Sequence, residues 1–285
     1  MKHEYKETLL YVENLSVAYD DTVIIKDITL IEKDVVRDGV HCTGQVVAFV
    51  GRSGRGKSTF FKALTGLIPT NSGKILIRDF ENKEPNAAKS VNEGDIGFVD
   101  QKYTLFRHKT VTQALRFSLR KTTLSNTEKE EKIKKYLKEW GLETCADKYP
   151  NELSGGQRQR TAIIEQLFSS DQFIVLDEPF SGLDVGNIEE VKKSFELLSS
   201  SSDFNTVIFS THDIELAIEL AQTIYVIGYP TINGKKEHYG TIVAKYDLRD
   251  MGLAWKDYCD DHLKLSKEII PVSYTHLTLP TTPYV

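Results

Sequence analysis

Residues 51–59 constrain this chain more than any other stretch. Their sequence, GRSGRGKST, fits the pattern G-x-x-x-x-G-K-[ST] of phosphate-binding loops. The apolar run 45–50 before the loop predicts a buried strand, and residues 60–66 after it predict a helix that ends at a glycine. Glycines allow consecutive N–H groups to point at one anion, and a helix N-terminus adds partial positive charge. The segment therefore predicts a site for nucleotide phosphates.

Within this loop, the pattern assigns a role to individual side chains. Lys57 is expected to reach the outer phosphates and to contribute to catalysis as a positive charge, and the Ser58 hydroxyl is placed to hold Mg²⁺. An alternative interpretation is a Gly/Ser loop that contains a lysine by chance, and the strand and helix beside it argue against this. The residues expected to bind the nucleotide here are Gly51, Arg52, Ser53, Gly54, Arg55, Gly56, Lys57, Ser58 and Thr59.

Composition narrows the class of protein. The 285 residues are enough for one large domain or two small ones, and the net charge of −5 argues against nucleic acid as the main partner. Cys42, Cys145 and Cys259 lie far apart without a C-x-x-C pair, which favours a reducing compartment and no metal cluster. No apolar run approaches the roughly 18 residues of a membrane span, and the charged start is unlike a signal peptide.

The order of periodic segments predicts an α/β fold. Apolar runs of strand length alternate with segments of helical period, and the pattern is helical throughout residues 102–165. Residues 32–43 are polar and contain a glycine, which predicts a loop. Strands are expected at 9–18, 23–25, 28–31, 74–77, 96–99, 173–176, 206–209 and 223–227, and helices at 127–140, 153–168, 188–198 and 214–221.

The C-terminal part has a different character. Gly234 and Gly240 predict a hairpin, and residues 255–265 predict helices. Residues 272–285 continue neither pattern and resemble the translation of a sequencing-library adapter, so we expect a non-native tail and exclude it from functional reasoning.

Further motifs follow the phosphate loop in a fixed order. Gln101 follows a short strand, and residues 153–157 read LSGGQ. Residues 173–179, FIVLDEP, form an apolar run that ends in two carboxylates, followed by SGLD at 181–184 and STHD at 210–213. Together these motifs resemble those of the ATP-binding-cassette (ABC) proteins, over about residues 9–228.

The resemblance implies an α/β fold, namely a P-loop NTPase core with a mainly parallel sheet, an antiparallel β subdomain and an inserted α-helical subdomain. It places the ABC ATPase domain at 1–228, with the helical subdomain at about 102–165, and leaves 229–271 as a short C-terminal extension. ATP and Mg²⁺ are the implied cofactors.

The resemblance also assigns catalytic roles. Asp177 and Gln101 are expected to hold Mg²⁺ together with Ser58, and Gln101 also to reach the attacking water. Glu178 is the expected general base, and His212 is expected to contact the γ-phosphate and position the water. Tyr19 lies where the family places an aromatic side chain that stacks on adenine, the alternative being a structural tyrosine.

Another set of residues is expected to act on a second subunit. In this family the LSGGQ residues and the aspartate of the following loop close over the ATP of a partner cassette, so one cassette per chain implies a homodimer or a heterodimer. These residues are Ser154, Gly155, Gly156, Gln157 and Asp184.

The implied function is the ATPase subunit of an ABC transporter on the cytoplasmic face of the membrane. It would energise a separate permease, most similar to importers of nitrate, sulfonates or related small anions, which also use a solute-binding protein. Alternatives are an exporter or lipid-transport ATPase and a non-transport ATPase of cell division or of an assembly pathway. A DNA-repair or translation ABC protein fits less well, because the chain is acidic and has one cassette. Asp100, Arg107 and Glu165 depart from the family pattern, the first two where a permease helix would dock.

Overall fold

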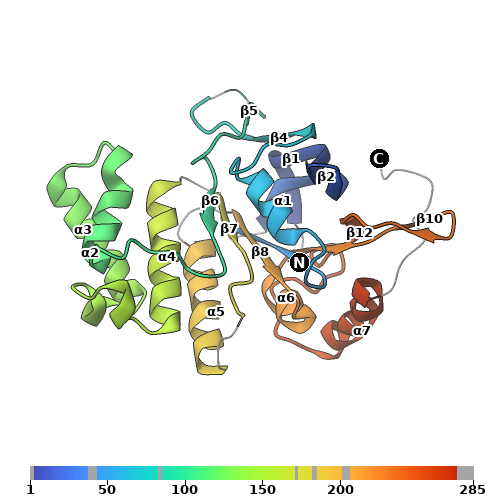
Figure 1. Ribbon diagram of the computed structural model, residues 1–285. Helices are drawn as coiled ribbons and strands as arrows, with labels where there is room; N and C mark the ends of the chain where they lie inside the picture. The colour runs from blue at the N-terminus through green and yellow to red at the C-terminus, as the bar shows by residue number, and fades with distance from the viewer. Residues whose placement is uncertain are drawn as a thin grey trace.

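The apolar runs of the sequence form the strands of a six-stranded sheet in the computed structural model (Figure 1). The structure describes residues 3–37, 44–82, 84, 86–170, 173–181, 185–200 and 206–274. The strand order is β12-β9-β3-β8-β7-β6, with neighbours parallel except for β12, which is antiparallel to β9. The strands are β3 (Gln45–Val50), β6 (Gly97–Val99), β7 (Phe173–Leu176), β8 (Thr206–Thr211), β9 (Thr223–Gly228) and β12 (Thr241–Asp247).

A second sheet is antiparallel and has the order β2-β1-β4-β5. Its strands are β1 (His3–Tyr19), β2 (Thr22–Arg37), β4 (Ser72–Arg78) and β5 (Ala88–Ser90). The two short strands expected at 23–25 and 28–31 are one strand, whose register against β1 is irregular near Asp27, a residue with φ of +53°. The predicted loop at 32–43 is wrong for residues 32–37, which continue β2, and residues 38–43 lie outside the described part.

The reason for this error is a buried charged network. The side chain of Glu32 is only 1% exposed. A polar residue such as glutamate is not expected in a buried strand unless its charge has partners. Its carboxylate accepts a 2.5 Å hydrogen bond from Tyr225 Oη in β9 and lies 3.8 Å from the Arg249 guanidinium. Burial raises the pKa of the Glu32 carboxyl, and the nearby cations Lys245 and Arg249 oppose this rise. A partner 193 residues later in the chain thus allows Glu32 to be buried within β2.

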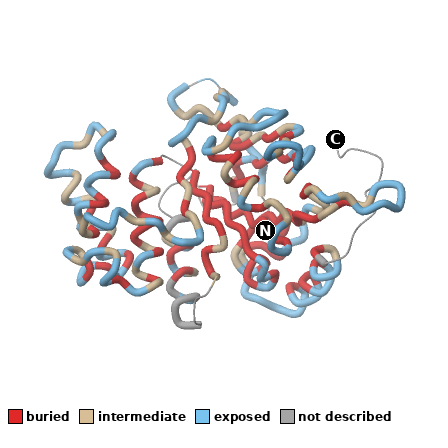
Figure 2. The backbone as a smooth tube through the Cα atoms, in the orientation of Figure 1, coloured by how far each residue is buried: buried red, intermediate tan, exposed pale blue. Residues whose placement is uncertain are grey.

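The helices cover both faces of the six-stranded sheet. Figure 1 shows α2, α3 and α4 grouped on one side, and Figure 2 shows that buried residues concentrate on the sheet and on the inner faces of the helices. The helices are α1 (Lys57–Leu64), α2 (Val111–Ser118), α3 (Asn126–Glu139), α4 (Gly155–Ser169), α5 (Val185–Ser200), α6 (Ile214–Leu220) and α7 (Asp260–Tyr274), with short 3₁₀ turns at Leu119–Lys121, Glu143–Cys145 and Pro150–Glu152.

Alternate residues of β3 enter two different cores. Val46, Ala48 and Val50 pack with the apolar faces of the helices α2 to α6. Val47 and Phe49 pack with α1 and with the antiparallel sheet. Successive side chains of β3 point to opposite faces of the sheet, so both faces of the strand are packed. This packing fixes the position at which the phosphate loop begins, directly after β3. The fold class predicted from the sequence is confirmed.

The chain after β9 joins the same sheet. The expected hairpin is present as β10 (Thr231–Ile232) and β11 (Lys235–Lys236), and β12 then pairs with β9. Helix α7 begins at Asp260 and continues to Tyr274, with Ser273 6% exposed, so the first residues of the proposed non-native tail are helical. Residues 275–285, the rest of that tail, lie outside the described residues.

A buried carboxyl group in α4 gives a pH-dependent prediction. Glu165 is 5% exposed, and burial raises its pKa to about 7. The folded protein therefore binds this proton more tightly than the unfolded chain, so stability falls as pH rises from about 4.5 to 7 and the loss persists above that. We expect Glu165→Gln to raise the free energy of unfolding at about pH 8 by on the order of 1–3 kcal/mol, measured by thermal or urea denaturation. The exposed Glu131→Gln should have no such effect, and an equal effect of both would contradict the prediction.

Candidate functional site

The phosphate loop begins where β3 leaves the sheet. Gly51 follows Val50 at a position where a Cβ atom would lie 2.4 Å from the Ile227 carbonyl oxygen of the neighbouring strand β9. Gly56 precedes α1 with φ of +90°, and a Cβ atom there would lie 2.5 Å from the Ile25 side chain. Only glycine fits these two positions, so the loop curls over the N-terminus of α1 as the sequence predicts.

Lys57 connects the phosphate loop to the carboxylates. Its side chain is 6% exposed, and Nζ donates to the Gly51 carbonyl at 2.6 Å and to the Arg52 carbonyl at 3.4 Å. The same ammonium lies 3.2 Å from Glu178 Oε1. Two residues that are 121 positions apart, and that the sequence assigned to one site, are therefore in direct contact.

The carboxylates lie at the carboxyl end of β7, next to β8. Asp177 is 6% exposed and accepts a 2.6 Å hydrogen bond from Ser210 Oγ. Ser210 Oγ also accepts from the Glu178 backbone N–H at 2.9 Å, so one hydroxyl orients both acidic residues. The sequence analysis gave Ser210 no role, although its place one residue before Thr211 at the end of β8 was a usable signal, because parallel strands end at the same edge of a sheet.

His212 contacts one of these carboxylates, and Gln101 contacts the segment that follows them. His212 Nδ1 lies 3.0 Å from Glu178 Oε2, and the histidine side chain is 64% exposed. Gln101 follows β6, and its Nε2 donates to Ser181 Oγ at 3.1 Å, just after the carboxylates. The sequence predicted no separate role for Ser181, so the contact of its hydroxyl with Gln101 is a second one that sequence patterns missed. The four predicted catalytic residues therefore lie around one edge of the sheet.

The residues assigned to the partner's nucleotide lie on a different element. Ser154 is exposed and caps α4, since its Oγ accepts from the Gln157 N–H at 3.2 Å while the Gln157 side chain accepts from the Ser154 N–H. Figure 1 shows α4 beside the helices α2 and α3, apart from α1. Asp184 lies outside the described residues. Tyr19, at the end of β1, is 49% exposed, so a ligand can reach its side chain.

The C-terminal extension supports the phosphate loop. Tyr229 Oη donates to the Gly54 carbonyl at 3.0 Å, and the Arg55 guanidinium lies 3.8 Å from the centre of the Tyr229 ring. A Cβ atom on Gly240 would lie 2.0 Å from the Arg55 carbonyl oxygen. These contacts with residues 54 and 55 were not predicted, because nothing local to residues 229–240 indicates that they return to the loop.

The donor set is compatible with a magnesium ion bound mainly through phosphate oxygens. Ser58 and Asp177 offer a hydroxyl and a carboxylate beside the phosphate loop, which is what Mg²⁺ requires of protein when phosphates and water supply the remaining ligands. Within the part of the chain that the structure describes, no group of three or more His, Cys, Asp or Glu residues forms a protein-only metal site.

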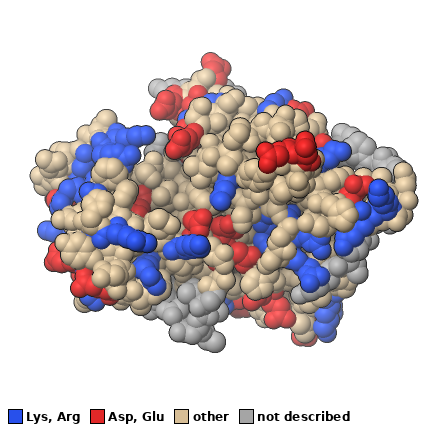
Figure 3. Space-filling view, in the orientation of Figure 1, with Lys and Arg blue, Asp and Glu red and all other residues tan. Residues whose placement is uncertain are grey.

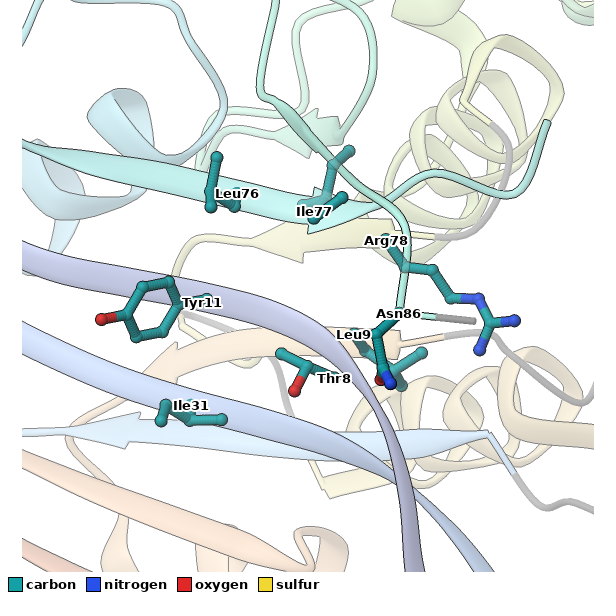
Figure 4. A pocket seen from close by; sticks show the side chains of 9 residues that line it. Thr8, Leu9, Tyr11, Ile31, Leu76, Ile77, Arg78 and Asn86 are labelled. Carbon is teal, nitrogen blue, oxygen red and sulfur yellow. The ribbon is translucent and has the colours of Figure 1, made fainter. Parts of the chain in front are cut away.

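A separate hollow lies on the antiparallel sheet, away from these residues. It has a volume of about 420 Å³, and its lining comes mainly from β1, β2 and β4 (Figure 4). Tyr11, Ile31 and Leu76 are among its apolar lining residues, and Arg78 also lines it. None of the predicted site residues lines it, so we assign it no role in nucleotide binding.

Positive and negative side chains are mixed on the face of the molecule seen in Figure 3. Figure 3 shows Lys and Arg side chains interspersed with Asp and Glu side chains on the visible face. Among the helices that the structure describes, none is both long enough and apolar enough to cross a membrane.

Comparison with known proteins places the chain in a family. The model of the family described as "ABC transporter" matches residues 41–181. The "Sulfate/thiosulfate import ATP-binding protein CysA" of Synechocystis is 34% identical over 238 residues, covering 84% of this chain and 62% of that protein. A Shewanella oneidensis relative, CysA 2 of the same description, is 38% identical over 72% of this chain and 56% of its own length. The chain thus spans about three fifths of the length of these two relatives.

A relative from Chlorella vulgaris and a solved structure are covered more fully. The former, "Probable sulfate/thiosulfate import ATP-binding protein CysA", is 38% identical over 65% of this chain and 76% of that protein. The structure of cbiO1 from Clostridium perfringens, described as part of the ABC transporter complex cbiONQ, aligns with a TM-score of 0.69 and 25% identity over 95% of this chain and 98% of that one. The match to the family model and the shared fold agree with the order of the motifs, and the chain belongs to the ABC transporter family of ATP-binding proteins.

Proposed function

We propose that this chain is the ATP-hydrolysing subunit of an ABC transporter and that Glu178 is its general base. One observation carries the proposal: the two oxygens of the Glu178 carboxylate face Lys57 Nζ at 3.2 Å and His212 Nδ1 at 3.0 Å. The base is therefore held between the charge that attracts the outer phosphates and the histidine expected to position the water.

The protein's own groups would bind and orient the nucleotide. The N–H groups of residues 51–59 and the N-terminus of α1 favour the phosphates, and Tyr19 offers a face for adenine. Ser58, Asp177 and Gln101 would hold Mg²⁺, which supplies charge neutralisation between the phosphates when bound. Ser210 fixes the Asp177 carboxylate through its 2.6 Å hydrogen bond, so this ligand is oriented before binding.

The chemistry then requires one proton acceptor. Glu178 Oε2 would accept the proton of an attacking water, with His212 Nδ1 3.0 Å from this oxygen and Gln101 hydrogen-bonded to Ser181, three residues after Glu178. The side chain of Glu178 is only 13% exposed, which limits competing solvent. Adding Mg-ATP to the purified protein and measuring phosphate release tests this activity directly.

The position of Ser154 on α4 supports a dimer with nucleotide between two cassettes, either identical or different. Ser154→Arg would place a bulky cation at the cap of α4, and we expect turnover to fall at least about tenfold while each subunit still binds ATP. The matched control is Ser125→Arg, which removes an equivalent capping box from α3 but should leave turnover intact. Equal losses in both variants would indicate a folding effect and would contradict a role across the interface.

We further propose that the partner is a membrane permease and that the transported solute is a small anion. The printed names of the relatives point to sulfate or thiosulfate import. Two exposed aromatic residues in the segment after Gln101 support a docking surface. Phe106 and Phe117 are 41% and 37% exposed, and their ring centres lie 5.2 Å apart, edge to face. This location would place the protein on the cytoplasmic face of the membrane.

Co-purification decides between transport and non-transport roles. We expect a permease with several apolar 20-residue segments, encoded beside this gene, to be retained by the protein, and retention to fall in Phe106→Asp. ATP-stimulated uptake of labelled sulfate by vesicles carrying the complex would support import. Export of solute, or an ATPase that binds no membrane protein, would favour the alternative classes.

A further inference from the structure

The backbone at Glu178 is in an unfavourable conformation. Its φ is +49°, in the left-handed region, which is rare for a residue other than glycine. The next residue is Pro179, whose ring further restricts the conformation of the residue before it. Such a residue keeps its shape only where surrounding contacts hold it, and such outliers concentrate at functional sites. The contacts that hold Glu178 therefore bear on its chemistry.

Two of these contacts meet at one buried carbonyl group. The Pro179 carbonyl oxygen accepts a hydrogen bond from Tyr103 Oη at 2.9 Å and another from Gln159 Nε2 at 2.5 Å. Pro179 is buried, and Gln159 is 0% exposed. We call Tyr103, Gln159, Pro179 and Glu178 the Pro179 junction. The donors come from two segments that are remote from β7 in sequence.

Each donor lies close in sequence to a residue that is expected to act on a nucleotide. Tyr103 lies two residues after Gln101 and also has a left-handed backbone, with φ of +47°. Gln159 lies on α4, two residues after Gln157 of the capping box at the partner-facing end. The junction thus joins the segment of Gln101, the helix of Ser154 and the peptide of the general base.

We propose that Tyr103 and Gln159 are positioning residues, which hold the Pro179 carbonyl so that the Glu178 carboxylate stays aligned for hydrolysis. The proposal rests on the assignment of Glu178 as the base. Because both donors belong to the segment after β6 and to the helix α4, movement of these segments relative to the sheet would change the alignment of Glu178. Binding of ATP uses the phosphate loop and would be little affected.

Removing single donor groups tests the proposal. Tyr103→Phe deletes only the hydroxyl, and Gln159→Leu replaces the amide at similar volume. The Gln159 Oε1 atom has no hydrogen-bond partner among the described residues, so its loss costs little stability. We expect each variant to lower kcat by about 2- to 10-fold with KM for ATP unchanged. The double variant should lose more than the product of the two, because the carbonyl then lacks both donors.

Amide hydrogen exchange, measured without nucleotide, tests the positioning role independently of ATPase activity. The Ser181 N–H donates to the Glu178 carbonyl at 3.1 Å, and the Glu178 N–H donates to Ser210 Oγ. If the junction holds this turn, hydrogen exchange at these two amides should be faster in both single variants. This readout remains valid if the wild-type protein proves to have no ATPase activity, an outcome that would overturn the proposed function itself.

Tyr136→Phe is the matched control. Tyr136 is a part-buried tyrosine of α3 that packs edge to face on Phe168, and within the described residues its hydroxyl makes no hydrogen bond. Its loss should alter neither kcat nor exchange at residues 178 and 181. Unchanged exchange and kcat in Tyr103→Phe, or equal changes in Tyr103→Phe and Tyr136→Phe, would overturn the proposal.

Discussion

Lys57→Ala should abolish ATP turnover and weaken nucleotide binding by several kcal/mol, the largest effect that we expect on binding. The ammonium is buried and hydrogen-bonded to the Gly51 carbonyl at 2.6 Å, so it acts in a site from which water is largely excluded. Electrostatic stabilisation in such a site exceeds that in water, and alanine supplies no charge for the β- and γ-phosphates. Binding of labelled or fluorescent ATP and release of phosphate measure the two effects.

The control for this variant is Lys62→Ala, which removes a lysine from the last turn of the same helix. Lys62 lies five residues after Lys57, about one and a half helical turns from the N-terminus of α1. Both binding and turnover should therefore stay close to wild type. Binding and hydrolysis at wild-type levels in Lys57→Ala would refute the assignment of the phosphate loop. A similar loss in Lys62→Ala would indicate instead that α1 itself is sensitive to substitution.

Glu178→Gln should stop hydrolysis while leaving ATP binding intact. Glutamine has almost the same shape but its amide cannot take a proton from water, so the general-base contribution of about 10²–10⁴ in rate should disappear. The substitution also removes a negative charge beside Lys57 Nζ, so the ammonium keeps its hydrogen bond to the Gly51 carbonyl and is more available to phosphates. Mg-ATP should therefore accumulate unhydrolysed at the subunit interface.

The measurement is the molecular mass in solution with and without Mg-ATP, by light scattering, together with phosphate release. We expect ATP-dependent dimers and turnover near zero, and no such change in Glu215→Gln, an exposed glutamate three residues after His212. Continued rapid hydrolysis would move the base elsewhere, with His212 the first alternative. If turnover is lost without a dimer, the same assay with the permease bound decides whether dimerisation depends on the membrane partner.

Local sequence patterns predicted those elements whose stabilising interactions form between residues close together in the chain. The start of α4 is an example, because the capping box at Ser154 needs only four consecutive residues. The phosphate loop is likewise confirmed in its setting between β3 and α1, since strand, glycines and helix are neighbours in the chain. Glu32 shows the limit: local polarity predicted a loop, whereas a hydrogen bond to Tyr225, 193 residues later, keeps it within a strand.

The sequence by itself determined which groups are available for chemistry and at which strand ends they lie, namely Lys57, Asp177, Glu178 and His212. The tertiary structure decided what holds them. Two sets of hydrogen bonds depend on strand register and on how α4 packs against the sheet. The Ser210 hydroxyl donates to the Asp177 carboxylate and accepts from the Glu178 backbone N–H, and Tyr103 and Gln159 donate to the Pro179 carbonyl. Such hydrogen bonds join segments tens of residues apart, and no periodicity encodes them, because their geometry exists only after the layers have packed.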